Sequence, residues 1–118
     1  MATIVIVDDE VHVGNALRRL LLRAGHSVEL FSSASDALTR CSDLLPDMVI
    51  SDFRMPEMTG SQLLAQMRGR FPQCVCVILT GDADGIELNP AVINSLVRKP
   101  WANIEMLEHL NNLLVEGT

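Results

Sequence analysis

Three aspartates follow two short apolar runs of the chain. Residues 4–7 read Ile-Val-Ile-Val and lead into Asp8 and Asp9, and residues 48–51 lead into Asp52. Short runs rich in β-branched residues and bounded by polar ones are typical of strands buried on both faces. Because the carboxyl ends of parallel strands lie along one edge of a sheet, we expect the three carboxylates to meet there. Such a cluster repels itself and needs a cation, and its oxygen ligands suit Mg²⁺.

Two further polar residues end later apolar runs. Thr80 closes the run that ends at Leu79, and Lys99 precedes Pro100. Taken in order with the acidic pair and with Asp52 in the stretch Asp-Phe-Arg-Met-Pro-Glu-Met-Thr-Gly, these features resemble the receiver domain of two-component response regulators. The resemblance covers nearly the whole chain, and four motifs in this order are far more specific than any one alone.

The pattern of the chain predicts one α/β domain over residues 1–118. We expect strands at residues 3–7, 27–31, 48–51, 74–79 and 95–98, and helices at 11–24, from Ser32-Ser33 to Pro46, after Gly60, at 89–94 and at 103–115. Strands alternating with helices favour right-handed crossovers and a parallel sheet. The resemblance implies a flavodoxin-like (βα)5 doubly wound sheet with strand order 2-1-3-4-5.

Apolar residues at helical spacing predict which side of each helix is buried. The first helix has an apolar stripe, with Gly25 as its C-terminal cap. The predicted inward residues are Val13, Leu17, Leu20, Leu21 and Ala24 in the first helix, Ala34, Ala37, Leu38, Cys41 and Leu45 in the second, Leu63, Leu64 and Met67 in the third, and Ile104, Leu107, Leu110 and Leu114 in the last.

The resemblance implies a Mg²⁺ site around a phosphate-accepting aspartate. Asp52 would be the nucleophile and phosphoacceptor, since a carboxylate can attack phosphorus and form an acyl phosphate. Asp9 and Asp52 would bind Mg²⁺ directly, Asp8 would bind it through water, and the backbone carbonyl of Arg54 would complete the protein ligands. The metal would offset the repulsion between the Asp52 carboxylate and the incoming phosphoryl group, which are both anionic.

The resemblance also implies two residues that contact the phosphoryl group. Thr80 would form a hydrogen bond with one phosphoryl oxygen and Lys99 would pair with another, because a hydroxyl and an ammonium suit an oxyanion. The Lys99–Pro100 peptide bond would be cis. Thr80 would also belong to the switch.

The chain departs from the family pattern between Thr80 and Lys99. The fourth helix and its flanking loops are short, and Leu96 stands where the family has an aromatic residue that swings inward. We therefore expect the response to pass through the loop after Thr80 instead of through Leu96. Arg54 and Asp82 are expected to form an ion pair at the mouth of the site. This pair would control the access of the water that attacks the phosphoryl group during dephosphorylation.

Composition narrows the classes of function. Nine basic and fifteen acidic residues give a net charge of −6, so no basic stripe is present to neutralise the phosphates of a nucleic acid. No apolar run approaches the roughly 20 residues that span a bilayer, and no signal-peptide pattern opens the chain. The odd number of cysteines, three, agrees with a reducing compartment. These features predict a cytoplasmic domain that contacts neither nucleic acid nor membrane directly.

Three functions remain to be distinguished. The preferred one is a phosphoacceptor that takes a phosphoryl group from a sensor histidine kinase or a phosphotransfer protein; it is a signalling domain that promotes its own Mg²⁺-dependent phosphorylation and dephosphorylation, not an enzyme acting on other substrates. A phosphohydrolase of the haloacid-dehalogenase type would need Asp-x-Asp after the first strand, where this chain has adjacent Asp8 and Asp9. A degenerate receiver would serve as a docking module without phosphorylation.

The residues around Lys99 also bear a less specific likeness to one group of receivers. The Lys-Pro-Trp sequence ending at Trp101 is similar to receivers of regulators with HD-type phosphodiesterase or transcription-activating outputs. A C-terminal output domain in a longer parent protein is compatible with this likeness. The kinase, the output and the oligomeric state are left open by the sequence.

Overall fold

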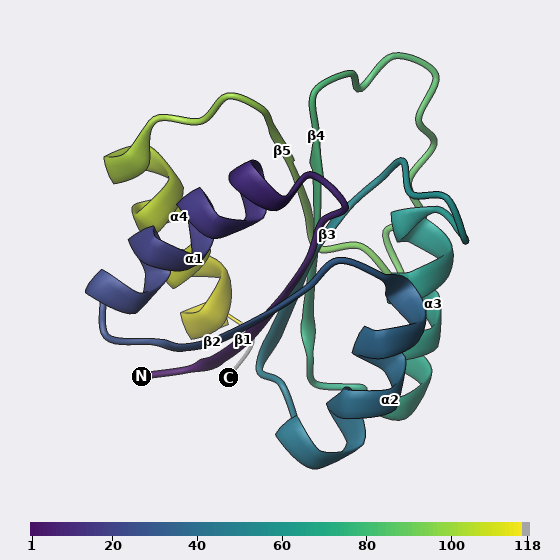
Figure 1. Ribbon diagram of the computed structural model, residues 1–118, viewed down its shortest axis with the longest axis horizontal. Helices are drawn as coiled ribbons and strands as arrows, with labels where there is room; N and C mark the ends of the chain where they lie inside the picture. Colours follow the sequence, from purple (N-terminus) through teal and green to yellow (C-terminus); the bar gives the residue numbers. More distant parts are fainter. Residues whose placement is uncertain (117–118) are drawn as a thin grey trace.

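The computed structural model describes residues 1–116 as a five-stranded sheet with helices on both faces (Figure 1). In chain order, its elements are β1 (Thr3–Val7), α1 (Val11–Arg23), β2 (Ser27–Phe31), α2 (Ala34–Leu44), β3 (Met48–Asp52), α3 (Gly60–Arg70), β4 (Val75–Thr80), β5 (Ser95–Arg98) and α4 (Asn103–Glu116). All neighbouring strands are parallel, and their order is β2-β1-β3-β4-β5. The predicted α/β fold and strand order are therefore confirmed.

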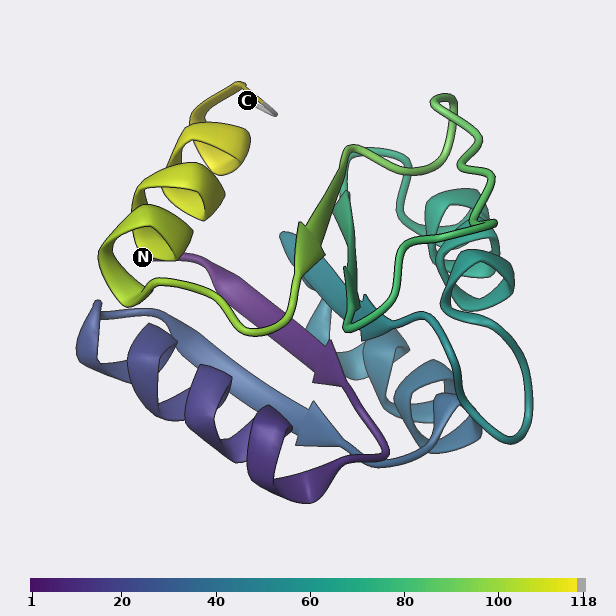
Figure 2. The same cartoon turned by 90° about the horizontal axis from the view of Figure 1, so that it is seen from above.

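The helices cover the two faces of the sheet as pairs. α1 and α4 lie on one face, and α2 and α3 lie on the other (Figures 1 and 2). Each face has its own apolar core, with Ile4 and Ile6 of β1 in one and Val5 and Val7 in the other. Because both faces are covered, β1, β3 and β4 are almost continuously buried, which explains their unbroken apolar sequences.

Local capping explains most of the helix boundaries. Gly25 has φ 94°, and the N–H groups of Gly25 and His26 donate to the carbonyls of Leu22 and Leu21, a Schellman motif that ends α1 as predicted. At the start of α2, Ser33 accepts a hydrogen bond from the N–H of Asp36. At the start of α3, Thr59 and Gln62 form a reciprocal capping box.

Three of the predicted inward residues are instead exposed. Leu45 takes a left-handed conformation that ends α2 and turns its side chain outward, leaving it 67% exposed. Ala24 is likewise exposed at the end of α1. In α4, Met106 and Leu110 form the buried face, so Ile104 in the first turn lies off it. Ala24 and Leu45 are the residues at which their helices end, whereas Ile104 lies within α4 on its exposed side.

The predicted helix at residues 89–94 does not form, so the described chain has four helices instead of five. Asn89 starts a single turn, in which its side chain accepts the N–H of Ala91 and its carbonyl accepts the N–H of Ile93. The chain then leaves this turn because Asn94 pairs with Cys76, donating to its carbonyl and accepting its N–H. Residues 81–94 are therefore a loop, which passes beside α3 (Figure 1).

Candidate functional site

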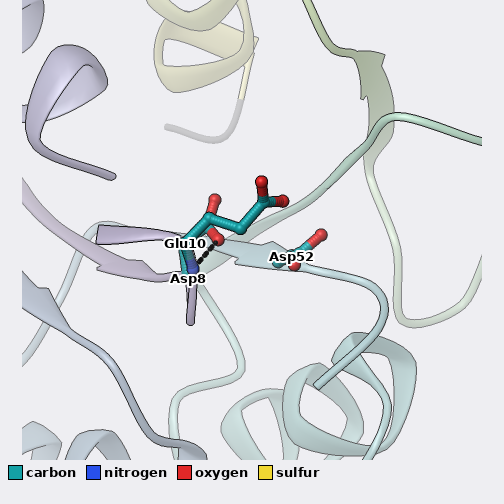
Figure 3. Close-up of side chains that lie close together, drawn as sticks. All are labelled: Asp8, Glu10 and Asp52. Carbon is teal, nitrogen blue, oxygen red and sulfur yellow. Dashed lines mark hydrogen bonds between the residues drawn. The ribbon is translucent and has the colours of Figure 1, made fainter. Parts of the chain in front are cut away.

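Two of the three predicted carboxylates, those of Asp8 and Asp52, lie together at the carboxyl edge of the sheet. β1 and β3 are neighbours in parallel register, with Val7 opposite Ser51, so Asp8 and Asp52 emerge side by side. Glu10, two residues beyond Asp8, joins them (Figure 3). One oxygen from each of these three carboxylates lies within 4.8 Å of the others. Asp8 is 1% exposed and Asp52 is 7% exposed, so the negative charge is concentrated where water is scarce.

Lys99 supplies positive charge to this cluster from the end of β5. Its Nζ lies 3.1 Å from Asp8 Oδ2, 3.0 Å from Glu10 Oε1 and 3.4 Å from Asp52 Oδ1. The N–H of Lys99 donates to the carbonyl of Thr80, which fixes the backbone of the lysine beside β4. The Lys99–Pro100 peptide bond is cis, as the resemblance implied.

The surroundings of Asp52 disfavour its charged form. The pKa of Asp52 is raised to about 6, first by burial and then by the negative charge of Asp8, whereas the ammonium of Lys99 lowers it. A contact with the Asp9 side chain also raises the pKa of Asp52. The repulsion from Asp8 and the burial together outweigh the single ammonium. A second cation would therefore be favoured here.

Asp8 and Lys99 respond to the same surroundings. Burial raises the pKa of Asp8, although the N–H of Glu10 and the ammonium of Lys99 counteract this. Burial by itself would lower the pKa of Lys99, but its hydrogen bond to Glu10 and the nearby carboxylates of Asp8 and Asp52 raise that pKa overall. Lys99 thus stays charged among the carboxylates.

The predicted ligands differ in how deeply they are placed. Asp9 is exposed at the rim but contacts Asp52, whereas Glu10 joins the cluster although no role was predicted for it. The signal for Glu10 was its position directly after the acidic pair. Arg54 is exposed in the loop that follows Asp52.

Thr80 is buried at the end of β4 and bound to its own loop. It is 2% exposed, its Oγ1 donates to the carbonyl of Asp82 at 3.0 Å, and the N–H of Asp82 lies 3.3 Å from the same oxygen. A change in the position of the Thr80 hydroxyl would therefore break two contacts with the loop. Leu96, opposite Ile78 in the sheet, is half-buried against the core beneath α2 and α3.

The predicted ion pair between Arg54 and Asp82 is absent. All ion pairs within 4.0 Å that residues 1–116 form involve Lys99. The Arg54 guanidinium instead lies over the Phe53 ring, 5.5 Å from its centroid. Asp82 accepts the N–H of Asp84. Each side chain has found a partner close in sequence, which costs less chain entropy than a bridge across the site.

The chemistry of the cluster fits a hard divalent cation. Asp8 Oδ2 is buried and lacks a hydrogen bond of acceptable geometry, although the ammonium of Lys99 is only 3.1 Å away. The ion pair is thus close but poorly aligned, and this oxygen has unused capacity as a ligand. With Asp52 beside it, the oxygen ligands are those that Mg²⁺ prefers.

Comparison with known proteins identifies the family. The family model described as response regulator receiver domain matches residues 4–111. The chain belongs to this family. It is 38% identical over 79 residues to the DNA-binding transcriptional regulator NtrC of Klebsiella pneumoniae, covering 67% of this chain and 17% of NtrC. It is 31% identical over 120 residues to the transcriptional regulatory protein KdpE of Mycobacterium tuberculosis, covering all of this chain and 53% of KdpE.

Among solved structures, the chain is similar to the signal receiver domain of an HD domain-containing protein from Pseudomonas fluorescens. The TM-score is 0.90 at 28% identity, over 98% of this chain and 88% of that one. The similar proteins thus include an HD domain-containing protein and two transcriptional regulators. The chain spans about half of KdpE or less than a fifth of NtrC. None of the helices within residues 1–116 has the length and apolarity needed to cross a membrane.

Proposed function

We propose that this receiver domain accepts a phosphoryl group on Asp52. The observation that carries the proposal is the convergence of Asp52 with a buried acidic neighbour, Asp8, and a charged Lys99 whose Nζ is 3.4 Å from the Asp52 carboxylate. A nucleophile, a counter-charge and unused oxygen ligands in one crevice are the parts that phosphoryl transfer requires. The degenerate alternative would need one of these parts to be missing.

In the proposed reaction, a sensor histidine kinase or phosphotransfer protein presents its phosphohistidine to this edge of the sheet. One oxygen of Asp52 attacks the phosphorus, and the new O–P bond forms as the P–N bond breaks. The electron pair of that bond remains with the imidazole. Lys99 then pairs with a phosphoryl oxygen, and the Thr80 hydroxyl donates to another.

Asp8, Asp9, Asp52 and the backbone carbonyl of Arg54 would hold Mg²⁺ in this site. When bound, the metal supplies positive charge that offsets the repulsion between the carboxylates and the incoming phosphoryl group. Lys99 is the residue whose position must change, because it now contacts Asp8 and Asp52. Release of these carboxylates leaves the ammonium free to face the phosphoryl group.

The proposed setting is a cytoplasmic two-component pathway. NtrC and KdpE are regulatory proteins longer than this chain, which supports a C-terminal output domain in a longer parent protein. Phosphorylation would alter the contacts with that output or with a separate partner. We propose no direct contact with nucleic acid, since the net charge is −6.

Intact-mass measurement tests the function directly. The wild-type protein, incubated with Mg²⁺ and a small acyl phosphate, should gain the mass of one phosphoryl group. Asp52→Asn should gain none, because its amide is not a nucleophile of this kind. Chelation of Mg²⁺ should abolish the gain in the wild type. An equal mass gain in Asp52→Asn, or none in the folded wild type, would contradict the proposal.

A further inference from the structure

The loop between β3 and α3 is joined to the start of α2 by Glu57. Its Oε1 accepts the N–H of Ala34 at 3.1 Å, and its Oε2 accepts the hydroxyl of Ser35 at 2.9 Å. Both oxygens of one carboxylate therefore contact a helix that comes 22 or 23 residues earlier in the chain. A carboxylate at this place is also favoured by the positive end of the α2 dipole.

The two ends of the same loop are held close to the phosphoacceptor. The N–H of Gly60 donates to the carbonyl of Phe53 at 2.8 Å, and the N–H of Phe53 donates to Leu79 at 3.3 Å. Between these ends, the sulfur atoms of Met55 and Met58 make only long contacts, at 3.9 Å and 3.8 Å. The bidentate contact of Glu57 is thus the firm polar anchor of the middle of the loop.

This anchored segment carries a proposed ligand. Arg54 lies between Phe53 and Glu57, and its backbone carbonyl is the one main-chain ligand proposed for Mg²⁺. Its exposed side chain lies over Phe53 and reaches no partner across the site. The conformation at Arg54 is therefore set by the backbone on either side of it. Of the two sides, only that of Glu57 is hydrogen-bonded to α2.

We propose that Glu57 is a positioning residue for the metal site, acting through the β3–α3 loop. By holding the loop against α2, Glu57 restricts the backbone at Arg54 before the cation arrives, so less conformational entropy is lost on binding. The inference rests on the proposed function, since it requires Mg²⁺ to bind beside Asp52. Glu57 contacts neither Asp8 nor Asp52 in the hydrogen bonds and ion pairs described for these residues.

Calorimetric titration with Mg²⁺ of the wild type, Glu57→Gln and Asp36→Asn tests this role. Asp36 is a matched control, because it is an exposed acid in the first turn of α2 and, within the described residues, its side chain forms no hydrogen bond or ion pair with the loop. Each variant loses one negative charge near the same helix end. We expect Glu57→Gln to weaken the Mg²⁺ affinity about threefold to tenfold, and Asp36→Asn to weaken it less than about twofold.

Ser35→Ala separates the loop contact from charge. This change removes one hydrogen bond to Glu57 and alters no charge, so we expect a loss of about twofold in Mg²⁺ affinity that disappears in the Glu57→Gln background. At saturating Mg²⁺, Glu57→Gln should be phosphorylated by the acyl phosphate at close to the wild-type rate. A general loss of structure would lower that rate as well.

The outcomes distinguish the inference from the function on which it rests. If the wild type binds no Mg²⁺, the proposed metal site is wrong. If the wild type binds it but Glu57→Gln and Asp36→Asn lose affinity equally, only charge matters and the positioning role is overturned. The same conclusion follows if the effects of Ser35→Ala and Glu57→Gln simply add.

Discussion

Gly60 lets the first turn of α3 approach Asp52, the proposed phosphoacceptor. A Cβ atom at this position would lie 2.4 Å from the carbonyl oxygen of Asp52 and 3.0 Å from Cδ1 of Ile78. The first of these contacts is with a backbone atom, which cannot move away by changing a side-chain rotamer. The absence of a side chain therefore permits the helix to begin against the residue that carries the proposed chemistry.

Gly60→Ala should destabilise the fold by about 2 kcal/mol or more, because the added methyl group displaces either α3 or the carbonyl of Asp52. Gly69→Ala is the matched control within the same helix, since nothing lies within 4 Å of its Cβ position. That variant should gain about 0.5–1 kcal/mol from helix propensity. Urea denaturation of both variants measures the two free energies. Equal stabilities would contradict the close approach.

At the scale of elements, the loop at residues 81–94 takes the place of the expected fourth helix. Its beginning is bound through the two contacts between Thr80 and Asp82. Its end is anchored to α3 by Arg68, which donates to the carbonyl of Val92 at 3.0 Å and to Asn94 Oδ1 at 2.6 Å. Between these points the loop includes Gly85, whose φ is 75°.

Amide hydrogen exchange should reveal this loop as the segment that responds to phosphorylation. Loading with beryllofluoride, a phosphoryl mimic, should draw the Thr80 hydroxyl toward the site and break its contacts with Asp82. The protection of backbone amides should then change between Gly81 and Ile93. The change should be largest in the part of the loop that precedes Val92, where Arg68 anchors it. If the changes centre on Leu96 and α4 while the loop is unaltered, the response takes the route usual in the family.

At the scale of the whole molecule, stability and the proposed metal binding should be coupled through the edge of the sheet. The raised pKa of Asp52 means that its ionised form is costly in the folded protein without metal. Lys99 is shared among three carboxylates and neutralises only one charge. The fold therefore carries an unfavourable electrostatic term in the region where it is expected to bind its cation.

Thermal and chemical unfolding with and without Mg²⁺ should show this coupling. Without metal, Asp52→Asn should be more stable than the wild type by about 1 kcal/mol, because a buried charge beside Asp8 is removed. At roughly ten times Kd, Mg²⁺ should stabilise the wild type by about 1.4 kcal/mol and the variant by much less. Should both proteins respond equally, Asp52 would not be a ligand.

Much of the fold, and part of the site, could be predicted from short-range patterns in the sequence. Buried strands need continuous apolar runs, and parallel pairing brings their carboxyl ends together, so the meeting of Asp8 and Asp52 was predictable. The place of Lys99 beside them was implied by the resemblance to receiver domains. Gly25 and Ser33 marked helix ends by their backbone and side-chain chemistry. These features depend on residues near one another or on a rule that holds for every parallel sheet.

Features that depend on competition between possible partners could not be predicted from local sequence patterns. Asn89 and Pro90 favoured a helix start, but the pairing of Asn94 with Cys76 and Arg68 drew the chain into β5 after one turn. The Arg54 guanidinium lies over the adjacent Phe53 ring and forms no ion pair with Asp82. Glu57 reached α2 across more than 20 residues of chain. Local preferences differ by only about 1 kcal/mol, so one or two hydrogen bonds between distant segments can reverse them.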